Sequence, residues 1–69
     1  MPTNISEHAA VDPNAQLGEN VEIGPFCVVG PHVTIGAGTR LLNHVTLTGH
    51  VTLGENNELF PGVVIGASP

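Results

Sequence analysis

The sequence predicts an all-β protein: a single parallel β-helix built from hexapeptide repeats. Two observations support this prediction, a strict six-residue period of aliphatic side chains and a concentration of Gly and Pro between them. The aliphatic residues recur without a break: Ile5, Val11, Leu17, Ile23, Val29, Ile35, Leu41, Leu47, Leu53, Leu59 and Ile65. A helix would repeat every 3.6 residues and a β-sandwich would vary its loops, so the constant spacing favours identical short strands joined by identical corners.

Each repeat divides into a strand and a corner. A second set of mostly small or β-branched residues precedes each aliphatic residue by two positions: Ala9, Ala15, Val21, Cys27, Val33, Thr39, Val45, Val51, Asn57 and Val63. Because side chains alternate along a strand, both sets point inward and the residue between them points outward. The expected strands are 9–11, 15–17, 21–23, 27–29, 33–35, 39–41, 45–47, 51–53, 57–59 and 63–65. Gly and Pro fall between these strands, where a sharp corner requires them.

Three hexads close a triangle, so 18 residues make one coil and the chain is expected to form just under four triangular coils. Residues 18 positions apart then stack on neighbouring rungs, about 4.8 Å apart. One outward column is charged and consists of Glu22, Arg40 and Glu58. The second is polar and consists of Gln16, Thr34 and Thr52. The third is apolar and consists of Ala10, Val28, Thr46 and Val64. Periodicity alone does not set the handedness of the coil.

The apolar column adjoins a corner that contains both phenylalanines and an extra leucine. A continuous apolar strip on an outer surface is typical of an interaction site. We therefore predict a subunit interface formed by Phe26, Val28, Leu42, Thr46, Phe60 and Val64. The alternative is a set of surface aliphatic residues with no partner.

Composition narrows the possible functions. The chain has 69 residues, enough for one domain, and a formal net charge of -5 with a single basic residue. One Arg cannot form a phosphate-binding surface, so neither nucleic acid nor an anionic membrane is expected as a partner. No apolar run reaches the roughly 18 residues of a transmembrane helix, and the start shows no signal peptide. These features, with a lone Cys27, favour a cytoplasmic protein.

The four histidines occupy the same corner position of their hexads: His8, His32, His44 and His50. In one column Phe26 lies between His8 and His44, and in another column His32 and His50 stack on adjacent rungs. Two stacked imidazoles could bind Zn²⁺ if a partner chain supplied further ligands, and a place in a pocket between subunits is a second possibility. Exposed corner residues without a ligand are the interpretation we favour, so we assign no metal site.

The sequence contains no clear pattern for nucleophilic catalysis or for phosphate binding. Ser6 and Ser68 have no His placed beside them by the repeat, and Cys27 falls in an inward position as a small core residue rather than a reactive thiolate. The glycines are explained by corners and form no phosphate-binding loop. Asn57 is a polar residue at an inward position; it either begins a polar ladder or bonds corner amides, and we favour the second. No catalytic or cofactor-binding residue is assigned.

Three longer strings are more specific than the hexad: IGPFCVVGPHV, NHVTLTGHV and GENNELFPGVVIGA. Together they resemble the N-terminal coils of the UDP-N-acetylglucosamine O-acyltransferase family of lipid A biosynthesis, from about His8 to Pro69. The resemblance implies a left-handed β-helix in a homotrimer. It also implies transfer of a 3-hydroxyacyl chain from acyl carrier protein to the 3-hydroxyl of UDP-N-acetylglucosamine, the first step of lipid A biosynthesis. In that family a His between neighbouring subunits is the general base, and no metal or cofactor is needed.

The family's catalytic His and sugar-nucleotide contacts belong to later coils, so none of the four histidines here receives a catalytic role. We expect residues 1–69 to be one β-helix segment, truncated at its C-terminal end and inactive alone. Three alternatives stay open: the N-acyltransferase of the same pathway, a γ-type carbonic anhydrase with His-held zinc, and a non-enzymatic structural β-helix. The first has a separate domain before its hexads, and an ice-binding helix would need a regular Thr array, which Gln16 interrupts.

Overall fold

The computed structural model describes residues 3–66, which form short strands and no helix. The strands are β1 (Asn4–Ile5), β2 (Ala10–Val11), β3 (Gln16–Leu17), β4 (Glu22–Ile23), β5 (Val28–Val29), β6 (Val33–Ile35), β7 (Arg40–Leu41), β8 (Thr46–Leu47), β9 (Val51–Leu53), β10 (Glu58–Leu59) and β11 (Val64–Ile65). Every strand pairing is parallel. Within these residues no helical segment is long and apolar enough to cross a membrane.

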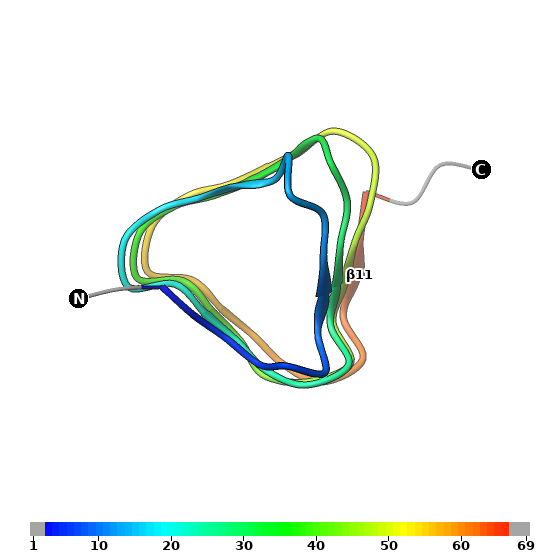
Figure 1. Ribbon diagram of the computed structural model, residues 1–69. Coiled ribbons are helices and arrows are strands. Elements are labelled where there is room, and N and C mark those ends of the chain that lie inside the picture. The colour runs from blue at the N-terminus through cyan, green and yellow to red at the C-terminus, as the bar shows by residue number, and fades with distance from the viewer. Residues whose placement is uncertain (1–2, 67–69) are drawn as a thin grey trace.

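The strands build three sheets that form the sides of a triangle (Figure 1). Sheet A has the order β1-β4-β7-β10, sheet B the order β2-β5-β8-β11 and sheet C the order β3-β6-β9. In Figure 1 the chain runs anticlockwise as it recedes from the viewer, so the coil is left-handed. Consecutive strands belong to different sheets, and each sheet receives one strand per coil, as the hexapeptide period predicts.

The register is an offset of 18 residues throughout. Glu22 pairs with Arg40 in sheet A, Val28 with Thr46 in sheet B and Thr34 with Thr52 in sheet C. The ladder bonds run between neighbouring coils: the amide of Gly24 donates to the carbonyl of Leu41 at 2.8 Å. The three outward columns expected from the sequence are therefore confirmed.

Strand length differs from the prediction. Only β6 and β9 contain three residues, and the other nine contain two. In several repeats the amide of the small inward residue closes its own corner instead of joining the ladder: Ala9 donates to the carbonyl of Ser6 at 3.0 Å and Ala15 to that of Asp12 at 3.0 Å. In β9 the equivalent amide, that of Val51, donates across to the carbonyl of His32 at 3.3 Å, which lengthens the strand by one residue.

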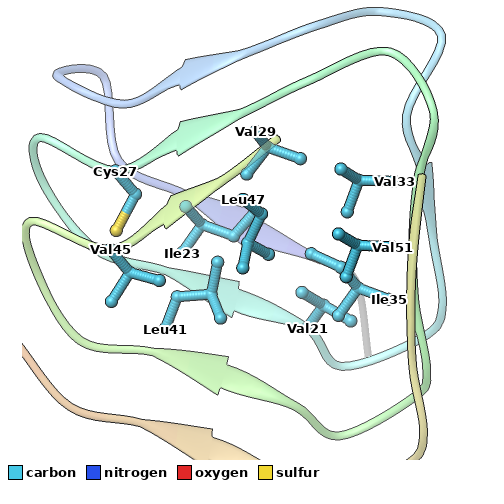
Figure 2. Packing of buried hydrophobic residues seen from close by; sticks show 10 residues of the cluster. All are labelled: Val21, Ile23, Cys27, Val29, Val33, Ile35, Leu41, Val45, Leu47 and Val51. Carbon is cyan, nitrogen blue, oxygen red and sulfur yellow. The ribbon is translucent and has the colours of Figure 1, made fainter. Parts of the chain in front are cut away.

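The core fills the triangle with ten buried apolar side chains (Figure 2). They come from all three sheets: Val21, Ile23, Cys27, Val29, Val33, Ile35, Leu41, Val45, Leu47 and Val51. Thr39 is the one buried polar residue within 3–66, and its hydroxyl donates to the carbonyl of Gly54 at 3.0 Å and accepts from the amide of Asn57 at 3.3 Å. Burial of Thr39 therefore leaves no side-chain donor or acceptor unsatisfied.

Two residues predicted to point inward are exposed. Ile5 is 42 % exposed and Asn57 is also exposed, because each lies on an outermost rung of the described coils with no further rung to cover it. The hydrogen bonds expected from the Asn57 side chain to corner amides are not formed within residues 3–66. Inward positions on the middle rungs are covered from both sides, which explains why burial is complete only there.

Candidate functional site

Sheet B presents an uncharged outer face. Val28, Thr46 and Val64 follow one another on successive rungs because β5 pairs with β8 and β8 with β11. Val28 is 42 % and Val64 59 % exposed, whereas Thr46 is half-buried. Three of the six predicted interface residues thus form one continuous ladder on this face.

The remaining three lie at the corner between sheets A and B, which precedes the outer face of sheet B. Phe26 and Phe60 are 56 % and 58 % exposed, and Leu42 is half-buried. Leu42 and Phe60 occupy one column on adjacent rungs, where the amide of Leu42 donates to the carbonyl of Leu59 at 3.0 Å. The sheet face and this corner together form the apolar strip, defined by Phe26, Val28, Leu42, Thr46, Phe60 and Val64.

An aromatic stack lines the same corner. The ring of Phe26 lies between those of His8 and His44, with centroids 5.7 Å and 5.2 Å away and interplanar angles of 19° and 27°. Phe26 and His44 hold φ values of 62° and 55°, a left-handed conformation that is costly for residues with a side chain. The amide of Phe26 donates to the carbonyl of His8 at 3.2 Å, which holds the two rungs in register at this corner. The sequence predicted the shared column but not the ring stacking.

The apolar strip is suited to association rather than to chemistry. It offers apolar area and aromatic rings but no charged side chain, and burial against a second surface would remove that area from water. Its role as a subunit interface stays a prediction.

The second histidine column stands at the corner between sheets B and C. The rings of His32 and His50 are stacked, with centroids 4.5 Å apart and planes at 15°, as the sequence predicted for adjacent rungs. They border an open groove of about 340 Å³ on the outer face of sheet C, whose polar lining includes Asn14, Gln16, Thr34 and Thr52. Sequence reasoning missed this groove; the only signal for it was a polar column beside a His column.

The serine and cysteine side chains of residues 3–66 have no imidazole partner suited to nucleophilic catalysis. The hydroxyl of Ser6 accepts a bond from the backbone amide of His8 at 3.2 Å rather than facing an imidazole. The His8 ring lies 3.6 Å from the carboxylate of Glu7, on the surface. Cys27 is buried in the core, and Ser68 lies outside the described residues. Across residues 3–66, no hydroxyl or thiol is bonded to an imidazole, and no three His, Cys, Asp or Glu side chains gather as metal ligands.

The solved structures that are similar to this fold include two acyltransferases. A UDP-N-acetylglucosamine acyltransferase crystal structure superposes with a TM-score of 0.93 at 44 % identity, covering 96 % of this chain and 26 % of its own. The Arabidopsis UDP-N-acetylglucosamine acyltransferase gives a TM-score of 0.86 at 38 % identity, covering 87 % of this chain and 21 % of its own. The chain thus spans about a quarter or less of the length of these structures.

At the level of sequence, no curated protein matches the chain. The family model described as bacterial transferase hexapeptide (six repeats) matches residues 2–37 and, overlapping them, 14–49. These two matches cover most of the chain, and they follow the repeat that builds the three sheets. The chain belongs to the bacterial transferase hexapeptide family.

Proposed function

We propose that this chain is the β-helical scaffold part of an acyltransferase that acts on UDP-N-acetylglucosamine. The reaction moves a 3-hydroxyacyl chain from acyl carrier protein to the sugar 3-hydroxyl, at the start of lipid A biosynthesis. The observation that supports it most is the 44 % identity to a UDP-N-acetylglucosamine acyltransferase across 96 % of the chain. The two structures compared above are both named UDP-N-acetylglucosamine acyltransferases, which favours such an activity over carbonic anhydrase and over a non-enzymatic β-helix.

The proposed role of these coils is structural. Residues 3–66 supply a buried core and an apolar strip, while no hydroxyl or thiol among them is paired with a base. We propose that the strip joins three copies into a homotrimer and that the catalytic base and the sugar-nucleotide contacts come from other coils. The proposed location is the cytoplasm, where a lone buried thiol such as Cys27 stays reduced.

A chimera tests this function. The matched coils of the acyltransferase that is 44 % identical are replaced by this chain, and acyl transfer from acyl carrier protein to UDP-N-acetylglucosamine is followed by mass spectrometry. The chimera should retain kcat/KM within about tenfold of its parent, since only scaffold is exchanged. The 69-residue chain alone should give no turnover.

Two results would contradict the proposal. One is a soluble chimera with the parent's oligomeric mass and no detectable transfer, which would mean that these coils do not serve that scaffold. The other is turnover by the chain alone, which would place catalytic groups within it.

A further inference from the structure

The two histidine columns differ in one respect that matters for metal binding. In the column at the corner of sheets A and B, the Phe26 ring separates His8 from His44, at 5.7 Å and 5.2 Å from their centroids. In the column at the corner of sheets B and C, the His32 and His50 rings face each other directly at 4.5 Å. Only the second pair can place two imidazole nitrogens on one ion.

The backbone fixes this second pair on neighbouring rungs. The amide of Val51, next to His50, donates to the carbonyl of His32 at 3.3 Å, and Val33 pairs with Val51 in the three-residue strands β6 and β9. The residues on which the rings stand are therefore held about one rung spacing apart, roughly 4.8 Å. The sheet sets this spacing before any ligand binds. Little backbone conformational entropy is therefore lost when an ion bridges the two rings.

The rings can reach chelating geometry by a small rotation. Two nitrogens bound to one ion at about 2.0–2.1 Å lie roughly 3 Å apart. The ring centroids are 4.5 Å apart with planes at 15°, and χ2 of His is a soft torsion, so tilting both rings toward a common edge closes the difference. Both side chains are exposed, so this rotation meets no core packing.

The surroundings suit a partly hydrated ion. The groove of about 340 Å³ beside the pair leaves room for water ligands. Its neighbouring polar side chains, Asn14, Gln16, Thr34 and Thr52, can hydrogen-bond such waters. Asn14 continues the His32–His50 column on the preceding rung, and its amide oxygen is a further donor atom in that column. Neutral imidazole nitrogen favours Zn²⁺, Cu²⁺ and Ni²⁺ over Mg²⁺.

We propose that His32 and His50 form a surface site for a divalent transition-metal ion, with water completing its coordination. The bound ion links two adjacent coils across the corner of sheets B and C. This differs from the assignment of no metal made from the sequence, which placed the two rings on adjacent rungs but did not show the backbone bond beneath them or the groove beside them. This proposal does not rest on the proposed acyl transfer.

Calorimetric titration of the 69-residue chain with ZnCl₂ tests the site. The wild-type chain should bind one Zn²⁺, and either His32→Asn or His50→Asn should weaken binding by at least about tenfold, since the second ligand no longer acts intramolecularly. The matched control is the double variant His8→Asn/His44→Asn, which removes two exposed corner histidines that cannot chelate together. It should bind Zn²⁺ as the wild type does.

Thermal unfolding supplies a second readout. Zn²⁺ that binds only the folded pair raises the Tm of the wild type and of the His8→Asn/His44→Asn control, but not of the His32→Asn or His50→Asn variants. MgCl₂ at the same concentration should leave every Tm unchanged. Equal Zn²⁺ affinity in the wild type and the His32→Asn/His50→Asn double variant would overturn the proposal, as would an equal loss in the control. A wild type that binds no Zn²⁺ would overturn it as well.

Discussion

At the scale of single residues, Gly24 shows why a corner position can require glycine for space alone. A Cβ added there would overlap the carbonyl oxygen of Leu42 on the next coil. The backbone of Gly24 does not adopt a positive φ, so conformational freedom is not the reason. Gly54 occupies the same slot after an aliphatic residue, yet its added Cβ would meet nothing closer than 3.8 Å. Glycines at equivalent positions of the repeat therefore differ in whether a side chain would fit there.

We expect Gly24→Ala to lower the free energy of unfolding by about 1–3 kcal/mol, because the methyl group must push two coils apart near the Gly24–Leu41 hydrogen bond. Gly54→Ala is the matched control and should change it by less than about 0.5 kcal/mol. Thermal denaturation followed by circular dichroism would measure both. Equal stability of the two variants would show that the coils adjust freely at this corner.

At the scale of strands, the charged column couples three rungs of sheet A. The Arg40 guanidinium on β7 lies 3.3 Å from the Glu22 carboxylate on β4 and 3.2 Å from the Glu58 carboxylate on β10. All three side chains are roughly half exposed, so water and salt screen the ion pairs. The column thus favours the native register more than it adds stability, because a slipped strand would separate Arg40 from one or both acids.

Replacing Arg40 by Met keeps most of the aliphatic stem and removes the charge. We expect the free energy of unfolding to fall by roughly 0.2–1 kcal/mol at low salt, and the loss should shrink in about 1 M NaCl. Glu55→Gln is the control, since Glu55 forms no ion pair with another residue of 3–66, and it should show no such salt dependence. Denaturant unfolding at two ionic strengths measures the difference. A loss that persists at high salt would indicate that packing of the Arg40 stem, not charge, is responsible.

At the scale of the whole molecule, the period of six determines much of the structure. It predicted three sheets, the 18-residue register that pairs Val28 with Thr46, and the inward positions, which are fully buried on the middle rungs. It could not predict the left-handed backbone of Phe26, because a turn pattern leads one to expect Gly at positive φ. The left-handed coil was predicted from the family resemblance and not from the period. The groove beside His32 lies between the His32–His50 column and the polar column of sheet C. The period assigns residues to each column, but it does not give the shape of the surface between two columns.

The apolar strip gives the whole-molecule prediction. If the strip joins three copies, carboxylates on it would be buried without partners, which is strongly unfavourable. The double variant Val28→Asp/Val64→Asp should therefore remain monomeric where the wild type has the mass of three chains, as measured by light scattering during size exclusion.

The control is Gln16→Asp/Thr52→Asp, which places the same charges at outward positions two rungs apart on sheet C, as Val28 and Val64 are on sheet B. Both variants raise the net negative charge equally, so general repulsion between copies is matched. The control should keep the mass of three chains. Loss of the assembly in both variants would point to overall charge, and its survival in both would show that the copies associate elsewhere. Only loss confined to Val28→Asp/Val64→Asp would place the contact on the apolar strip.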